Sequence, residues 1–311
     1  MLKLSFLRLS TLLLRILAVA LCVGLFACDD SEETGETIGY NCAGELKTGS
    51  TPTFSISGYV KDGKTGNMLS GTVNLYDSLG VSLLGDSSVS SSSKYSFSGL
   101  TPSWYILKAD ISDYTTVPDK KCLTSTKNNK FLYSLKSSDA TNANVIVLTW
   151  DDDSTNDLDS HLLASGGSPE DTHIGYNGRG YGSGSDYDNA SNDSQWAWID
   201  KDARLSASNC GNSVSNCPPE TITLGLDSTS GPIRNNVDKA CYYVYMYSSG
   251  TWSGMTDVEV MLFQSDGTFL KNFTPPADTS TSNRYWHVFD LDSNLIYTEI
   301  KTASSTKPTC S

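Results

Sequence analysis

The feature that most limits how this sequence can fold is the spacing of its apolar residues. In segments such as 56–60 and 73–75 an apolar side chain recurs at every second position, and Asp62-Gly63 and Thr65-Gly66 mark turns. A period of two is that of a strand with one buried face, whereas a helix repeats near 3.6. Such runs recur along the chain and helix signals are few, so the sequence predicts an all-β protein.

The length of the chain predicts two domains. Beyond residue 27 the chain is longer than one typical domain requires, and residues 138–144 are small and polar, as expected of a linker. We therefore expect two β-sandwich domains, a small one over residues 51–137 and a larger jelly-roll-like one over residues 145–311.

The N-terminus has the order of features found in a secretory signal peptide. Basic residues, the last of them Arg15, precede the apolar run Ile16–Phe26, and small Ala27 follows. The apolar run of 11 residues is too short to span a bilayer, which takes about 20 residues. Residues 1–27 are therefore predicted to be a cleaved signal peptide.

The end of this segment, Leu25-Phe26-Ala27-Cys28, resembles the lipobox of bacterial lipoproteins. The resemblance implies that Cys28 is lipidated and becomes the first residue of the mature chain, anchored at the outer membrane, the cell surface or a periplasmic face. The alternative is ordinary secretion with a free Cys28. Residues 28–50 are polar and acidic, and we expect a flexible tether there because such a stretch buries little apolar surface.

The charge of the chain argues against one class of partner. The formal net charge is −13, and removal of the three basic residues of the signal, which holds no acidic residue, makes it −16. A field of this sign repels nucleic acid, whose binding depends on Lys and Arg. Nucleic acid is therefore not expected as a partner.

The cysteines predict disulfides. Cys22 leaves with the signal and Cys28 would carry lipid, which leaves an even number in an exported chain. Six cysteines allow about 15 pairings, and proximity and the domain limits favour three of them: Cys42–Cys122, Cys210–Cys217 and Cys241–Cys310. A zinc site at Cys210 and Cys217 would need closer paired spacing and further ligands.

A series of short motifs in the first domain has a family resemblance. The series is Gly58-x-Val60-x-Asp62, Thr65-Gly66-x-Met68-Leu69, Tyr95-x-Phe97 and Tyr105-x-Leu107. It resembles the carboxypeptidase regulatory-like domain, which implies a transthyretin-like β-sandwich and not the catalytic half of a peptidase. Two departures are the turn Ser91–Lys94, where a Gly turn is usual, and Ser103-Trp104 in place of Pro-Gly.

The second domain carries a longer series of anchors. They are Leu148-Thr149-Trp150, Asp157-Leu158-Asp159-x-His161, His173-x-x-Tyr176-Asn177, Trp198-Ile199-Asp200, Pro219-Glu220-Thr221 and Trp286-His287-Val288-Phe289. This order resembles the YfaP-like domain of exported bacterial proteins. The resemblance implies an extracytoplasmic β-sandwich and says little about activity. An enlarged loop over residues 175–194 departs from it.

The acidic and histidine residues after the apolar run 145–150 form a candidate metal site. On a strand, Asp157, Asp159 and His161 would share one face, while Leu158 and Leu162 would face the other way. The candidate ligands are Asp151, Asp153, Asp157, Asp159, His161 and His173. The carboxylates suit calcium and the histidines suit zinc or another transition metal. The alternative is turn chemistry and a buried hydrogen-bonded pair.

Aromatic residues are the other candidate for a functional surface. Tyr176, Tyr181, Tyr187 and Trp196 lie in and beside the Gly-rich loop, where they would contact a sugar or a protein. The aromatics of the run 242–247 are expected to lie mostly in the core, since alternate residues of a strand face inward.

No catalytic motif stands out. The sequence has no G-x-S-x-G elbow, and paired acids such as Asp200 and Asp202 are common on solvated faces. We therefore expect a non-enzymatic role in binding or adhesion to an envelope or host protein or a glycan. The alternatives are a structural or assembly component of the envelope and a metal-dependent envelope hydrolase.

Overall fold

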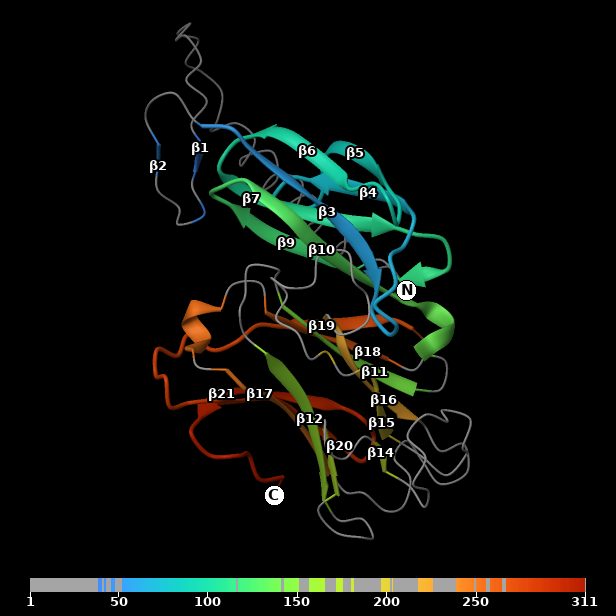
Figure 1. Cartoon of the computed structure of the whole chain (residues 1–311), viewed down its shortest axis with the longest axis vertical. Coiled ribbons are helices and arrows are strands. Elements are labelled where there is room, and N and C mark those ends of the chain that lie inside the picture. Colours follow the sequence, from blue (N-terminus) through green and yellow to red (C-terminus); the bar gives the residue numbers. More distant parts are fainter. Residues whose placement is uncertain are drawn as a thin grey trace, which may run out of the picture. The chain divides into compact units, whose positions relative to one another are not determined.

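A computed structural model describes most of the chain after residue 38 (Figure 1). The described residues are 39–40, 42, 46–47, 52–115, 117–140, 143–150, 157–165, 172–175, 180–181, 197–201, 203, 218–225, 239–248, 250–255, 258–264 and 267–310. All of them belong to one compact unit, Gly39–Ser311. The predicted signal peptide, the lipidation site Cys28 and residues 28–38 lie outside the described residues.

The described residues confirm the all-β prediction. They form strands together with two short 3-10 turns, η1 (Ser137–Ala140) and η3 (Trp252–Gly254). No helix among them has the length and apolar character needed to cross a membrane.

The first sandwich contains two four-stranded sheets. Its outer sheet has the order β5 (Leu83–Val89), β4 (Gly71–Tyr76), β7 (Ser103–Asp110), β9 (Pro118–Leu123). Its inner sheet has the order β6 (Tyr95–Leu100), β3 (Phe54–Asp62), β10 (Lys127–Lys136), β8 (Tyr114–Thr115), and β3 and β10 run parallel. Alternate residues of these strands, among them Val60, Val73 and Leu107, bury one face of each sheet in a common core.

A short hairpin precedes the first sandwich. It pairs β1 (Gly39–Tyr40) with β2 (Leu46–Lys47).

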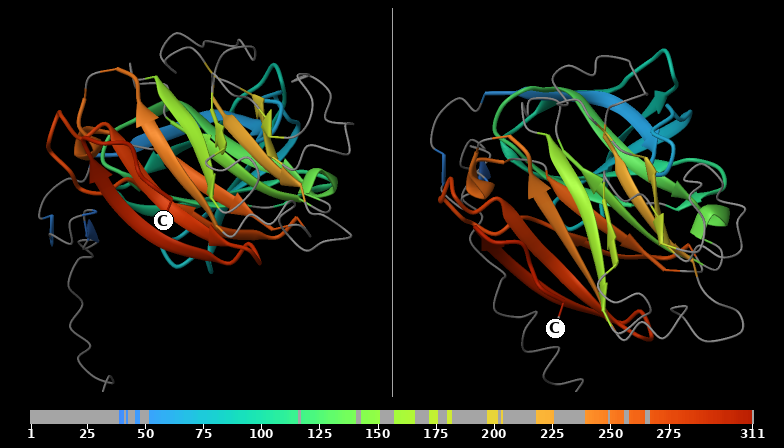
Figure 2. Two further views of the ribbon diagram at one scale, coloured as in Figure 1. Left: turned by 90° about the horizontal axis from the view of Figure 1, so that it is seen from below. Right: turned by 60° about the horizontal axis from the view of Figure 1, so that its bottom comes forward.

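The second sandwich also contains two sheets (Figure 2). Its inner sheet has the order β14 (Gly180–Tyr181), β15 (Ala197–Lys201), β16 (Glu220–Gly225), β11 (Ala143–Thr149), β18 (Glu259–Phe263), β19 (Phe269–Phe273). Its outer sheet has the order β13 (Thr172–Ile174), β12 (Leu158–Ser165), β17 (Lys239–Met246), β20 (Tyr285–Asp292), β21 (Tyr297–Ser304). The core between them is rich in aromatic residues and includes Trp150, Trp252, Trp286 and Tyr242.

A third apolar layer joins the two inner sheets. Tyr59, Phe131, Tyr133 and Leu135 of the first sandwich form one buried cluster with Val145, Val147, Met261 and Phe263 of the second. The sheets therefore follow one another as four layers, with an apolar core between each pair. All seven residues of β11 are buried because Ile146 and Leu148 face one core while Val145 and Val147 face the next.

Two of the three predicted disulfides are confirmed. Cys42 is bonded to Cys122, which ties the β1–β2 hairpin region to β9. Cys241 of β17 is bonded to Cys310 in the C-terminal segment. The third predicted pair, Cys210 and Cys217, lies outside the described residues. The predicted linker 138–144 overlaps η1 and the first residues of β11, and the domain limits stay a prediction.

Candidate functional site

Asp159 and His161 of the predicted acidic and histidine row lie on β12, in the outer sheet of the second sandwich. Asp157 directly precedes β12, and its N–H donates to the hydroxyl of Ser248 at 3.1 Å. β12 pairs with β17 so that Asp159 is opposite Tyr245 and His161 is opposite Tyr243. Leu158 and Leu162 point into the core, as the alternation predicts. Asp159 and His161 are therefore on the outward face, and both are buried.

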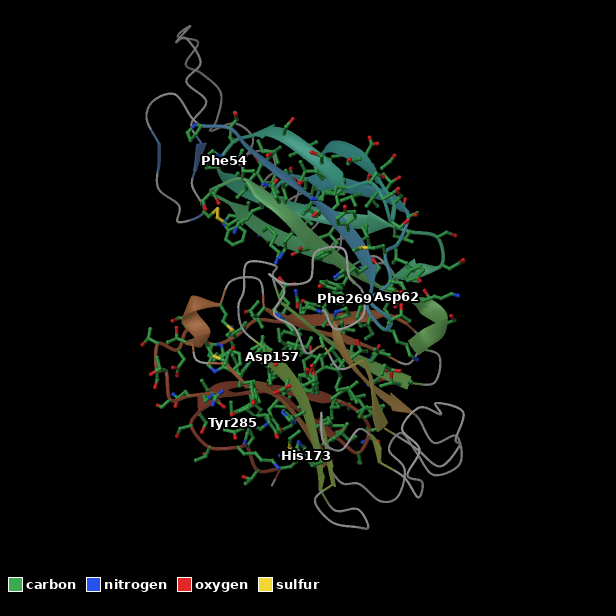
Figure 3. The ribbon with its side chains drawn as sticks, viewed as in Figure 1. Phe54, Asp62, Asp157, His173, Phe269 and Tyr285 are labelled. Atoms are coloured by element: carbon green, nitrogen blue, oxygen red, sulfur yellow. A yellow bond between two sulfur atoms is a disulfide. The ribbon has the colours of Figure 1, made fainter. Side chains whose placement is uncertain are left out.

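The two histidines of the row meet each other. His173 comes from β13, and its Nε2 lies 2.8 Å from Nδ1 of His161. Tyr243 stacks on His161 with ring centroids 4.7 Å apart, and its hydroxyl lies 3.2 Å from Nε2 of His173. Figure 3 labels His173 together with Asp157 and Tyr285 on this sandwich. The rings form a stacked, hydrogen-bonded group, which we call the histidine cluster: His161, His173 and Tyr243.

Gly175 makes room for the histidine cluster. A Cβ atom at this position would lie 2.3 Å from Nδ1 of His161 and 3.3 Å from Nε2 of His173. No ordinary side chain fits at the first of these distances, so the cluster requires glycine here. The sequence carried this signal only as one of several glycines at the start of the enlarged loop.

Both histidines are neutral at physiological pH. Burial, helped by His173 and Lys307, lowers the pKa of His161 to about 3. Burial and Lys307 lower the pKa of His173 to about 4. Since an unfolded histidine titrates near pH 6.5, the unfolded state binds more protons below that pH. The cluster therefore contributes stability that is present at neutral pH and is lost as the pH falls from about 6.5 towards 3.

The distance between the two imidazole nitrogens can be compared with that expected for a metal site. A neutral imidazole is the form that binds a metal. Zinc is coordinated tetrahedrally, with Zn–N distances of about 2.0–2.1 Å. Two nitrogen ligands of one zinc ion therefore lie more than 3 Å apart. The nitrogens of His161 and His173 lie 2.8 Å apart, which is hydrogen-bond distance and shorter than the separation of two zinc ligands. Asp151 and Asp153 lie outside the described residues, and the metal site stays a prediction.

The C-terminal segment covers part of this face. The Cys241–Cys310 bond fixes it to β17, and Cys310 packs with a buried group formed by Leu163, Cys241 and Tyr243. Lys307 of the same segment lies close enough to both histidines to lower their pKa values. A segment more than 140 residues away in the sequence thus contributes to the surroundings of His161.

The predicted ligand-contact residues are mostly outside the described residues. This applies to Tyr176, Tyr187 and Trp196; Tyr181 lies in β14, and its side chain is outside the description. In the later aromatic run, Tyr242 packs in the core against Phe289, with ring centroids 5.2 Å apart. Tyr247, at the end of the same run, is 63% exposed.

The structure brings together a second group that the sequence did not predict. Cys241, His287 and Asp290 place one possible ligand atom each within 4.8 Å of one another. Nε2 of His287 lies 2.6 Å from Asp290, and Lys239 lies 2.9 Å from the same carboxylate. Because the sulfur of Cys241 is bonded to Cys310, it offers no thiolate to a metal. The only sequence signal was the pair His287 and Asp290 three positions apart.

A buried ion network lies where the two sandwiches meet. Nζ of Lys121, on β9, lies 3.0 Å from Asp119 and 2.5 Å from Glu259 on β18. Asn272 donates to the other oxygen of Glu259 at 2.8 Å. A small cavity of about 20 Å³ adjoins the network and is lined by Asp119, Lys130, Thr149 and Glu259, among others. This volume is near that of a single water site.

Burial and charge act differently on the two acids of this network. Burial raises the pKa of Asp119 to about 6, and the nearby charge of Glu259 adds to this. Burial also acts to raise the pKa of Glu259, but Lys121 and Lys130 outweigh it, so that its pKa is lowered. Glu259 is therefore the member that stays ionised, and Asp119 is the one that takes up a proton first.

Further polar contacts cross the same junction. Nζ of Lys61 donates to the carbonyl of Pro218 at 3.4 Å, and Thr115 donates to the carbonyl of Gly267 at 2.7 Å. Lys64 pairs with Asp200 at 3.4 Å. The junction thus combines an apolar layer with specific hydrogen bonds and ion pairs, which fixes its geometry more tightly than apolar contact alone.

Comparison with known proteins gives no family. No protein-family model and no curated protein sequence matches the chain. Among solved structures, the chain aligns with the major pilin BcpA of Bacillus cereus over 71% of its length and 67% of the pilin, with 5% identity and a TM-score of 0.25.

Two further structures give similar values. A streptococcal ancillary pilin aligns over 74% of this chain and 65% of its own, with 13% identity and a TM-score of 0.23. A putative carbohydrate binding protein from Bacteroides uniformis aligns over 68% and 98%, with 7% identity and a TM-score of 0.21. Similarities at this level carry no argument about function.

Proposed function

We propose that this protein is an exported, lipid-anchored cell-envelope protein whose second sandwich is displayed for non-enzymatic binding or adhesion. The lipid on Cys28 and the tether would hold the chain to the membrane, and the first sandwich would act as a spacer. A protein, a glycan or another envelope component would be the partner.

The observation that carries the proposal is the order of the layers. The N-terminal segment is bonded through Cys42 to Cys122, which stands on the outer sheet of the first sandwich. The second sandwich packs against the inner sheet, and its Glu259 also reaches Lys121 of β9 at the edge of the outer sheet. A chain anchored at its N-terminus would therefore be attached through the first sandwich, with the core of the second sandwich beyond the inner sheet.

The junction supports a spacer role. The apolar layer and the ion network hold the sandwiches together, and Thr221 of the second sandwich donates to the carbonyl of Gly63 in the first. Relative domain motion is the usual expectation unless an interface is extensive and apolar. Here the interface is apolar along β10 and β11, which favours a fixed presentation.

The state of the described histidines supports a non-enzymatic role. His161 and His173 are hydrogen-bonded to each other, and His287 is paired with Asp290. A general base needs to reach the proton that it abstracts, and these groups are committed to contacts within the fold. The competing role, a structural part of the envelope without a separate ligand, shares the same anchoring and spacing.

Cell fractionation with antibody labelling tests the proposal. The full chain and the Cys28→Ser variant are expressed in a bacterial host, and intact cells or spheroplasts are labelled with an antibody raised against the β20–β21 turn around Asn294. We expect the natural chain in the membrane fraction with the turn accessible, and the variant absent from that fraction. A variant that stays in the membrane fraction in equal amount would contradict the proposal.

Binding is tested with the same cells. Cells that carry the anchored protein are applied to surfaces coated with purified glycans or envelope proteins, and cells with Cys28→Ser are the matched control. Retention that depends on Cys28 supports adhesion. Equal retention on every surface leaves the anchoring intact and favours the structural role.

A further inference from the structure

The hairpin between β4 and β5 exposes an unusual group of apolar side chains. Leu79 is 79% exposed, Val81 78%, Leu83 56% and Leu84 52%. Trp104 on β7 is 39% exposed, and we call these five residues the hairpin patch. Single exposed apolar residues are common on protein surfaces, but a contiguous group marks a contact with a partner or a membrane.

Hydrogen bonds hold the backbone of the hairpin turn in place. The Oδ1 atom of Asp77 accepts hydrogen bonds from the N–H groups of Leu79 at 3.2 Å and Val81 at 3.0 Å. The N–H of Gly80 donates to the carbonyl of Asp77 at 2.9 Å, and Gly80 has a φ of +72°, which favours glycine. The patch is therefore presented by a preformed turn.

Strand register places the hairpin patch beside the attachment of the N-terminal segment. Tyr76, the last residue of β4, is opposite Ile106, and Trp104 is opposite Cys122. The chain that continues past Tyr76 into the hairpin thus runs towards the end of the sheet where Trp104 and Cys122 lie. Cys122 is the residue bonded to Cys42, so the patch and the N-terminal attachment share one end of the outer sheet.

The length of the tether limits how far this end can be from a membrane. Cys28 precedes Cys42 by 14 residues, which span at most about 50 Å when fully extended. A lipid on Cys28 would therefore keep Cys42, and the strand β9 that is bonded to it, within about 50 Å of the bilayer. The apolar contact of the second sandwich is with the inner sheet, whereas Trp104 and the hairpin belong to the outer sheet.

The residues around the patch suit a membrane interface. Nζ of Lys120 lies 5.5 Å from the ring centre of Trp104, and Nζ of Lys108 lies 4.5 Å from that of Tyr76. Tryptophan, tyrosine and lysine are the residues that place apolar atoms in the acyl region and polar ends among the headgroups. The carboxylate of Asp77 accepts hydrogen bonds from the backbone of its own turn, which lower its pKa and keep it ionised.

We propose that the hairpin patch docks on the phospholipid bilayer to which Cys28 anchors the chain, so that the first sandwich lies on the membrane surface. This inference rests on the proposed lipid anchor. Docking of the patch would add a second membrane contact to the lipid on Cys28. It would fix the orientation of the first sandwich as well as its distance from the membrane.

Quenching by brominated lipid tests the docking directly. The full acylated chain is reconstituted in phosphatidylcholine vesicles with or without bromine on the acyl chains, and tryptophan fluorescence is recorded. Trp150, Trp252 and Trp286 are at most 2% exposed, which makes Trp104 the accessible tryptophan among those whose side chains the structure describes. We expect quenching that is lost in Trp104→Phe and reduced at least twofold in the double variant Leu79→Asp, Val81→Asp.

Ile296→Asp is the matched control. Ile296 is 64% exposed on the second sandwich, outside the patch, and this variant should keep the full quenching. Circular dichroism of each variant checks that the fold is intact, as expected for substitutions of exposed side chains.

Flotation of the same vesicles separates the two proposals. Protein that floats with the vesicles but shows the same quenching as Trp104→Phe would overturn the docking and leave the anchor standing. Protein that does not float, with no lipid mass on Cys28, would overturn the anchor and with it this inference. Floating protein with quenching that depends on Leu79 and Val81 supports both.

Discussion

At the scale of single residues, the histidine cluster is assembled from three strands: His161 comes from β12, His173 from β13 and Tyr243 from β17. The alternation in β12 correctly placed His161 and Asp159 on one face. It could not show that His173 would supply a hydrogen bond, or that the segment around Cys310 would bury the face. Those contacts arise from tertiary packing, and the apolar periodicity of a single strand carries no information about it.

Gly175→Ala is predicted to destabilise the protein. The added Cβ would lie 2.3 Å from His161 and 3.3 Å from His173, so the histidine cluster must shift. Overpacking of this kind costs about 1–3 kcal/mol, measurable as a lower urea midpoint. Gly85→Ala is the control, because its Cβ would meet Phe97 at an ordinary 3.8 Å. Equal midpoints for natural protein and Gly175→Ala would contradict the tight packing.

Zinc is predicted not to stabilise the natural protein at pH 7. Nδ1 of His161 and Nε2 of His173 are bonded to each other, so binding would first have to break that bond. Thermal unfolding is recorded in EDTA, in calcium and in zinc. A 1 mM ion at a micromolar site would add about 4 kcal/mol. A rise of several degrees that disappears in His173→Gln or Asp159→Ala would instead establish the metal site that the sequence suggests.

At the scale of elements, the strands could be predicted from the sequence, but the packing of one sheet on another could not. Most of the apolar run 145–150 belongs to β11, and all seven residues of this strand are buried. The second partner of that strand, the face of β10 that carries Phe131 and Tyr133, gave no local signal. Proximity along the chain and domain limits sufficed for two disulfides, because each closes within one sandwich or its flanking segment.

Cys310→Ser is predicted to lower the free energy of unfolding by about 2–4 kcal/mol. The disulfide closes a loop of 69 residues, and without it the unfolded chain gains conformational entropy. The measurement is the urea midpoint under non-reducing conditions. The same variant should also raise the exchange rate of backbone amides around Cys241, since the covering segment is released. Ser305→Ala on the same exposed segment is the control, and a midpoint equal to that control would refute the role given to this bond.

At the scale of the whole molecule, four sheets form one unit through the junction between the sandwiches. The ion network around Lys121 joins residues more than 130 positions apart, and the apolar layer spans both inner sheets. Nothing in the sequence pairs Asp119 with Glu259, since both look like ordinary surface acids. The serial order from N-terminal attachment to second sandwich emerges only at this scale.

Asp119→Asn is predicted to stabilise the protein above pH 6 and to have little effect below pH 4. Burial raises the pKa of Asp119 from 3.8 to about 6, so the folded state keeps this proton when the unfolded state has lost it. Stability is therefore lost as the pH rises through this window, by up to about 3 kcal/mol. Because Asn cannot ionise, the variant does not lose this stability as the pH rises.

Urea midpoints between pH 4 and 7.5 measure the effect. The difference between Asp119→Asn and the natural protein should grow with pH in favour of the variant. Asp86→Asn, at an exposed position of β5, should run parallel to the natural protein. If the stability of Asp119→Asn relative to the natural protein fell between pH 4 and pH 7.5, the raised pKa assigned to Asp119 would be contradicted.

The mass of the mature protein tests the central claim most directly. The full chain is expressed in a bacterial host and extracted from its membranes, and its N-terminal peptide is analysed by mass spectrometry. The account predicts a chain that starts at Cys28 and carries acyl groups on that cysteine. A mature chain that starts elsewhere, or a Cys28 without lipid, would contradict the anchored arrangement on which the proposed display of the second sandwich depends.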